Sequence, residues 1–72
     1  MSASFEIEIQ GMSCGHCVKT IREALGRVEG VTVRDVVIGR AVIDLDERAA
    51  SPQDVENAID ETGFVFVEMS AT

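Results

Sequence analysis

The sequence predicts a small α+β domain with the order strand, helix, strand, strand, helix, strand. Three observations predict this fold class. The chain has 72 residues, which suffice for one domain, so we expect residues 1–72 to form a single unit. Two segments carry apolar residues at helical spacing, and the segments around them alternate or are rich in β-branched residues. Hydrophobic residues make up 46% of the chain, which is enough to form a core.

The first half of the chain predicts a strand, a loop and a helix. In residues 5–10 apolar side chains alternate with polar ones, which indicates a strand with one buried face. Residues 11–16 are predicted to form a loop that leads into the helix. From Cys17 onward, steps of three and four residues define one apolar helical face, made of Val18, Ile21, Ala24, Leu25 and Val28. Gly30 is the predicted end of this helix.

The middle of the chain predicts a β-hairpin. Its strands are expected at residues 31–38 and 41–45, with a tight turn at Gly39-Arg40. The apolar run of residues 36–38 does not alternate. A bulge in the first strand and burial of both of its faces therefore both stay open as interpretations.

The last third predicts a second helix and a final strand. Ser51 is the expected N-cap, Pro52 belongs to the first turn, and Asp54 completes a weak capping box. Gly63 ends the helix, whose buried stripe consists of Val55, Ala58 and Ile59. A short strand follows at residues 64–68, and Met69 falls in a predicted frayed tail. This order is the ferredoxin-like βαββαβ arrangement, a four-stranded antiparallel sheet with two helices on one face.

The charge of the chain restricts its partners. The formal net charge is -7, from thirteen acidic and six basic residues. Nucleic acid is excluded because phosphates bind clustered Lys and Arg, and direct membrane binding is disfavoured for the same reason. An acidic domain prefers a partner with a basic patch, although the charge can also serve solubility alone. No stretch approaches the roughly 20 apolar residues of a membrane span.

A cytoplasmic location is the next expectation. Residues 1–4 do not combine a basic segment with a following apolar run, so they do not resemble a secretory signal. Thiols stay reduced in the cytoplasm. The two closely spaced cysteines are therefore expected to be ligands or redox groups, not a structural disulfide.

Cys14-Gly15-His16-Cys17 is the one motif with reactive potential. Two intervening residues place both sulfurs within reach of one ion, and the helix start stabilises thiolates through its unpaired N–H groups. Soft thiolates favour soft metals, and two of them cannot complete the tetrahedral shell of structural Zn(II). We therefore predict Cys14 and Cys17 as the metal ligands of one ion, foremost Cu(I) or Hg(II), with Ag(I), Cd(II) and Zn(II) as further candidates.

The segment from Gly11 to Cys17, Gly-Met-Ser-Cys-Gly-His-Cys, resembles the metal-binding motif of heavy-metal-associated domains. This family includes small copper chaperones, the N-terminal domains of copper-transporting P-type ATPases and mercury-binding carriers. The resemblance extends to Gly30-Val31 and to residues 61–64, Glu-Thr-Gly-Phe, so it covers nearly the whole chain. It implies the same βαββαβ fold, ligation by Cys14 and Cys17, and a relationship to small bacterial-type copper chaperones.

The resemblance also implies roles for neighbours of the cysteines. Met12 is expected to anchor the loop in the core and not to bind metal. Phe64 occupies a position beside the predicted loop of residues 11–16, called the metal loop below. Eukaryotic chaperones commonly have lysine at this position and many bacterial ones tyrosine, whereas phenylalanine is more typical of ATPase domains and mercury carriers. From its place in the loop, His16 is interpreted as solvent-facing, with a third metal ligand as the alternative. Lys19 and Arg22 are interpreted as part of a solvated helix face, with partial balance of the thiolate charge or contact with a partner as the alternatives.

The predicted function is that of a metallochaperone and not of an enzyme. Copper would pass by thiol exchange to a partner Cys-x-x-Cys, such as that of a metal-transporting P-type ATPase. A mercury carrier and an excised ATPase domain are the alternatives. A thiol–disulfide oxidoreductase is disfavoured because the chain is short and Pro52, its one proline, starts a helix. We expect the apo protein to be a monomer that copper can bridge into a dimer.

Overall fold

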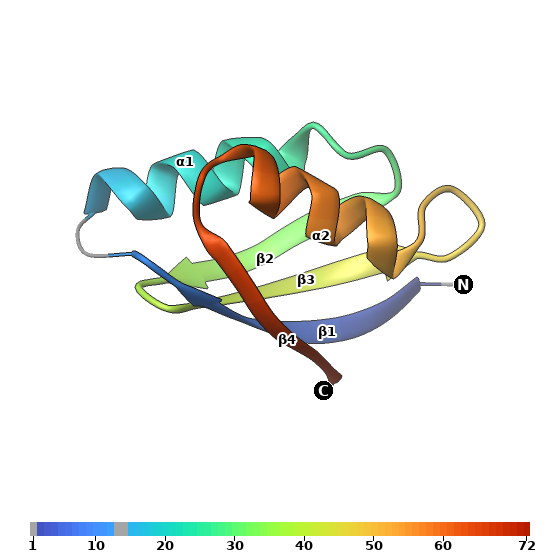
Figure 1. Ribbon diagram of the computed structural model, residues 1–72. Coiled ribbons are helices and arrows are strands. Elements are labelled where there is room, and N and C mark those ends of the chain that lie inside the picture. Colours follow the sequence, from blue (N-terminus) through green and yellow to red (C-terminus); the bar gives the residue numbers. More distant parts are fainter. Residues whose placement is uncertain (1, 13–14) are drawn as a thin grey trace.

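The computed structural model describes residues 2–12 and 15–72, and it confirms the predicted α+β class. Strands and helices follow in the order β1 (Ser2–Gln10), α1 (Gly15–Gly26), β2 (Val31–Val37), β3 (Arg40–Asp46), α2 (Pro52–Glu61) and β4 (Val65–Ala71). The strands form one antiparallel sheet in the order β2-β3-β1-β4. Both helices cover the same face of this sheet, and the other face is open (Figure 1).

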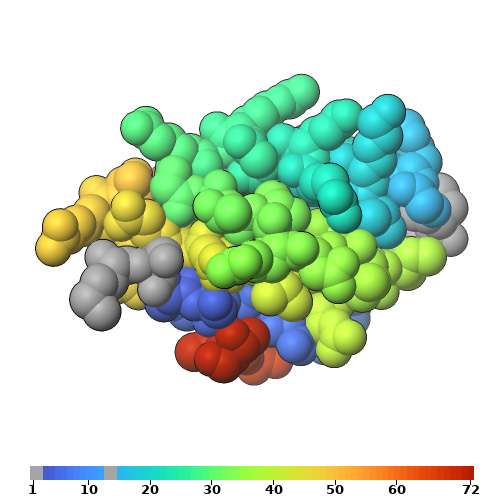
Figure 2. All heavy atoms as spheres, turned by 180° about the vertical axis from the view of Figure 1, so that it is seen from behind, coloured from blue at the N-terminus to red at the C-terminus, as the bar shows by residue number. Residues whose placement is uncertain are grey.

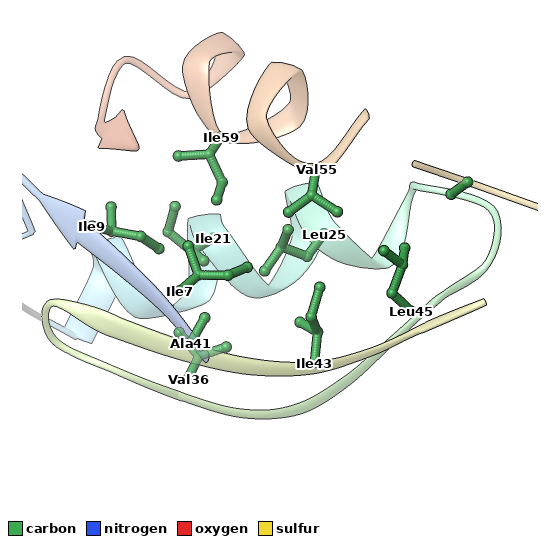
Figure 3. Close-up of a cluster of buried hydrophobic side chains, with 11 residues drawn as sticks. Ile7, Ile9, Ile21, Leu25, Val36, Ala41, Ile43, Leu45, Val55 and Ile59 are labelled. Atoms are coloured by element: carbon green, nitrogen blue, oxygen red, sulfur yellow. The ribbon is translucent and has the colours of Figure 1, made fainter. Parts of the chain in front are cut away.

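The core lies between the sheet and the helices (Figure 3). Its side chains come from alternate positions of β1 and β3 and from positions four apart on each helix, as the two periodicities require. The fully or nearly fully buried residues are Ile7, Ile9, Ile21, Leu25, Val36, Ala41, Ile43, Leu45, Ala50, Val55 and Ile59. Burying a side chain of Leu or Ile size contributes about 1.5–3 kcal/mol each. Among the described residues no polar side chain is buried, so apolar packing forms the core.

Helix α1 begins and ends earlier than predicted. It begins at Gly15, so His16 and Cys17 lie in its first turn. It ends at Gly26, because the N–H groups of Arg27 and Val28 donate to carbonyls three residues back, at 3.3 and 3.1 Å. This tighter turn leaves Val28 packed against the core while the α-helix has already ended.

Gly30 has a different role from the predicted helix stop. Its φ is +90°, and a Cβ there would lie 2.7 Å from the Cβ of Ala49. Its carbonyl accepts a 2.7 Å hydrogen bond from the N–H of Asp46. Gly30 therefore lets the chain before β2 approach the end of β3, and a side chain would prevent that approach.

The β2–β3 turn is shifted by one residue from its predicted position. Val37 pairs with Arg40, so the turn consists of Ile38 and Gly39, and Arg40 belongs to β3. The pairing register changes between Val33 and Asp35, which decides in favour of a bulge in β2. The interpretation that both faces of this strand are buried is wrong, because Val37 and Ile38 are 41% and 55% exposed.

Strand β4 is longer than predicted. It begins one residue later than expected, at Val65, and continues to Ala71. Met69 pairs opposite Ile7 and packs against the core, so its assignment to a frayed tail was wrong. The extension depends on pairing with β1, and the N–H of Thr72 still donates to the carbonyl of Ser4 at 3.1 Å.

Helix α2 has the predicted start and end. Ser51 is its N-cap, in an extended conformation, and Pro52 is its first residue. The carboxylate of Asp54 accepts the N–H of Ser51 at 3.0 Å and its hydroxyl at 3.3 Å. Gly63, with φ +90°, follows the C-cap residue Thr62. The capping chemistry visible in the sequence therefore forms in the structure.

Candidate metal centre

Four chain segments lie toward one end of the molecule, the end at which α1 begins. They are the end of β1, the start of α1, the β2–β3 turn and the connection from α2 to β4 (Figure 1). The view from behind also shows the start of α1 and the β2–β3 turn at the same end (Figure 2). Residues that are far apart in the sequence therefore contribute to a single site.

Cys17 is the predicted ligand that the structure describes. It is half-buried in the first turn of α1, where backbone N–H groups lack helical partners. The first turn contains no acidic residue that would oppose a thiolate there. The N-terminal end of a helix carries a partial positive charge, which is favourable for a negatively charged group at this position. Cys14 lies outside the described residues, and the ligand roles of both Cys14 and Cys17 stay predictions from the sequence.

Met12 is placed as an anchor of the loop. Its side chain is half-buried and packs against the core. Its Sδ accepts a hydrogen bond from the backbone N–H of Gly39, with an N–S distance of 3.4 Å. Both contacts attach the loop to the sheet, which agrees with the role that the family resemblance implies. The hydrogen bond to Gly39 was not predicted, since no local sequence pattern links two residues 27 positions apart.

Phe64 lies beside the start of the metal loop. Its side chain is half-buried against the core, and a Cβ built on Gly11 would lie 3.4 Å from the Phe64 Cδ1 atom. Gly11 has a φ of +95°, a conformation that residues with a side chain rarely adopt. The aromatic ring therefore packs closely against the backbone that leaves β1. This position matches the one implied by the resemblance.

The remaining candidate residues face solvent. His16, Lys19 and Arg22 are all exposed on α1, and His16 lies in the helix, not in the loop. Within residues 2–12 and 15–72, no three His, Cys, Asp or Glu side chains are grouped closely enough to hold a metal ion. The structure thus brings Met12, Cys17 and Phe64 to one end of the molecule and leaves Lys19 and Arg22 on the helix surface.

A groove of about 670 Å³ lies between α1 and α2 and begins at Thr20, one helical turn beyond Cys17. Ala24 and Ala58 contribute small side chains to it, and four acidic residues, Glu23, Glu29, Asp54 and Glu61, line it together with Arg27. Small residues leave the space open, and the acids give it a net negative charge. The net charge of the chain was the one sequence signal for this surface.

The sequence model of the heavy-metal-associated domain matches residues 6–64. The chain belongs to the heavy-metal-associated domain family. A relative of this heavy-metal-associated domain, the copper chaperone CopZ of Enterococcus hirae, is 39% identical over 61 residues, which are 82% of this chain and 88% of the relative. The apo structure of a copper chaperone from Enterococcus hirae matches with a TM-score of 0.75 and 35% identity, over 94% of this chain and 98% of the other.

Two further solved structures share the fold of this heavy-metal-associated domain. Oxidized MerP from Ralstonia metallidurans CH34 has a TM-score of 0.84 and 28% identity, over 100% of this chain and 99% of the other. A copper-binding domain from a P-type ATPase has a TM-score of 0.82 and 26% identity, over 100% and 95%. The predicted ferredoxin-like fold is thereby confirmed. No helix in the described part of the chain is long and apolar enough to cross a membrane.

Proposed function

We propose that this heavy-metal-associated domain is a metallochaperone that binds one Cu(I) ion through Cys14 and Cys17 and passes it to a partner. The observation that carries the proposal is the half-buried Cys17 thiol at the N-terminus of α1, separated from a second cysteine by two residues in the sequence. Soft thiolates in this electrostatic setting suit Cu(I). The similarity to proteins named copper chaperones supports copper as the cargo.

The proposed mechanism is ligand exchange. Two thiolates leave coordination positions of Cu(I) open, so a thiolate of the partner's Cys-x-x-Cys can bind before either cysteine of this chain departs. The ion passes through a three-coordinate intermediate, and no bond of an organic substrate is made or broken. The domain supplies ligands and a docking surface, which is why we propose a carrier and not an enzyme. A metal-transporting P-type ATPase is the proposed acceptor.

Met12 and Phe64 support this mechanism because neither residue offers a stabilising group to the ion. The Met12 sulfur already accepts the Gly39 N–H. Phe64 presents an apolar ring where a lysine or tyrosine would offer a cation or a hydroxyl to the bis-thiolate centre. A site with few stabilising groups favours release to a second pair of thiols. Phe64 is also the observation that favours the second candidates, a mercury carrier or an excised ATPase domain.

Anaerobic titration with Cu(I) against a strong chelator tests the proposal. We expect one equivalent to bind tightly, and Cys17→Ser and Cys14→Ser each to abolish that binding, because a single thiolate does not hold Cu(I) against a chelator. His16→Ala is the matched control, since this exposed side chain is not a proposed ligand. Protein that binds no Cu(I) but reduces insulin disulfides would instead be an oxidoreductase. Hg(II) that displaces Cu(I) and is then retained would favour the mercury carrier.

The remaining proposals concern location and assembly. We propose a cytoplasmic protein that binds neither nucleic acid nor a membrane directly, in keeping with its acidic charge of -7. The apo monomer and the copper-bridged dimer stay predictions, and size-exclusion chromatography with and without Cu(I) distinguishes them. An unchanged monomer at full copper loading would contradict the bridged dimer.

A further inference from the structure

The backbone of Gly39 is hydrogen-bonded to residues on both sides of Gly11. The Gly39 carbonyl accepts the N–H of Ile9 at 2.9 Å, just before the metal loop. The Gly39 N–H donates to the Met12 Sδ at 3.4 Å, just after Gly11. One residue of the β2–β3 turn therefore fixes both the end of β1 and the first part of the metal loop.

We propose that the β2–β3 turn positions the metal loop through the Met12 sulfur, so that Met12 acts as a hydrogen-bond acceptor and not only as an apolar anchor. This inference rests on the proposed metal-carrier function and assigns a positioning role to Met12 and Gly39. Neither residue touches the metal. Their effect on the ion is indirect, through the placement of Met12, which precedes Cys14 by two positions in the sequence.

The geometry of the turn explains why it can hold a loop. It is a two-residue connection closed by the Val37–Arg40 pair, so few backbone angles are free to change. Strand β3 is central in the sheet and also pairs with β1 over seven residues. The position of Gly39 is therefore set by the sheet, and its two hydrogen bonds transmit that position to the loop. Supporting contacts of this kind hold binding residues in a productive geometry.

The chemistry of the contact makes the sulfur important. The contact between the Gly39 N–H and Met12 is partly buried. Loss of the acceptor would leave this N–H unsatisfied and would lower the stability of the folded state. The thioether sulfur of methionine is a weak hydrogen-bond acceptor, whereas the leucine side chain, of similar volume, has no acceptor atom. Met12→Leu should therefore keep most of the packing and lose the hydrogen bond. Met69→Leu is the matched control, because Met69 is half-buried against the same core from β4, opposite Ile7.

The test uses the apo protein and two readouts besides stability, namely amide hydrogen exchange at Gly39 and the rate at which iodoacetamide alkylates the two cysteines. We expect Met12→Leu to lower the protection of the Gly39 amide by about tenfold and to speed alkylation, while Met69→Leu changes neither. Urea unfolding of both variants corrects for any general loss of stability. Equal Gly39 protection and equal alkylation rates in the two variants would overturn the proposal.

A second variant separates sulfur from side-chain size. Norleucine, incorporated in place of methionine in the Met69→Leu background, replaces sulfur with a methylene group at Met12 and at Met1 only. We expect the same loss of Gly39 protection, and full protection would overturn the role of the sulfur. Because these readouts need no metal, a chain that binds no Cu(I) would refute the proposed function without refuting this inference. With Cu(I) bound, Met12→Leu should keep one ion but release it faster to a chelator.

Discussion

Asp44 on β3 is a residue whose environment depends on contacts across the sheet. The Ser4 hydroxyl donates to its Oδ1 at 2.6 Å, and the Arg34 guanidinium forms an ion pair with Oδ2. The Ser4 hydrogen bond is the larger cause, and both partners hold the pKa of Asp44 below its ordinary value of 3.8. A lowered folded-state pKa stabilises the fold above the unfolded pKa. That stabilisation is lost as the pH falls through the folded value.

We expect Ser4→Ala to raise the pKa of Asp44 toward its ordinary value, because the main hydrogen bond to the carboxylate is lost. The NMR titration of the Asp44 carboxyl carbon measures this shift directly. The free energy of unfolding should then depend less on pH in the range between the lowered pKa of Asp44 and its ordinary value. Ser70→Ala on β4 is the control, since Ser70 pairs opposite Glu6 and not opposite Asp44. An unchanged Asp44 titration would show that Ser4 is not the cause.

The sequence predicts the roles of some single residues but not the long-range contacts of others. The spacing of Cys14 and Cys17 is a local pattern, and so is the helix start that favours thiolates. The Met12–Gly39 and Ser4–Asp44 contacts join residues 27 and 40 positions apart. Such contacts depend on which strands become neighbours and on their exact register. No periodicity in the sequence carries that information, so these two contacts could be found only in the structure.

The same distinction holds for helices and strands. Their order and type were predicted because apolar periodicity and capping residues are local signals. The ends of α1 and β4 were misplaced because tertiary contacts set them. Val28 continues the apolar stripe of α1 although the backbone has already left the helix. Met69 continues β4 because β1 offers a pairing partner up to Ala71.

Helix α2 offers a test at this scale. Asp54 accepts the Ser51 N–H and places a negative charge in the first turn. We expect Asp54→Ala to lower the free energy of unfolding by about 1 kcal/mol, since both the cap and a favourable interaction with the helix dipole are lost. Urea denaturation measures the change. Asp60→Ala, at the opposite end of the same helix, should be neutral or slightly stabilising, and an equal loss in both variants would contradict the capping explanation.

At the scale of the whole molecule, the sheet and the helices present different surfaces. The face covered by α1 and α2 contains the acidic groove, which begins one turn from Cys17. Glu23 and Glu61 lie on opposite walls of this groove, one on each helix. A basic acceptor domain that docks here would place its own cysteines near the metal end. For the proposed acceptor, a basic surface would be attracted from a distance by the overall charge of -7, and the groove would orient it.

Charge reversal in the groove tests this orientation. We expect the double variant Glu23→Lys, Glu61→Lys to slow Cu(I) transfer to a Cys-x-x-Cys acceptor domain with a lysine-rich surface by about tenfold at low salt, because electrostatic steering is lost. In stopped-flow measurements, the difference in transfer rate between the variant and the unchanged protein should become smaller as the ionic strength increases, since salt screens exposed charges. The double variant Glu8→Lys, Glu68→Lys is the charge-matched control, because Glu8 and Glu68 are exposed and lie opposite each other on β1 and β4, away from the helices. If this control slowed transfer as much as the groove variant does, net charge alone would govern docking. Transfer slowed by the groove variant alone would assign docking to the face that carries α1, α2 and the start of the metal loop.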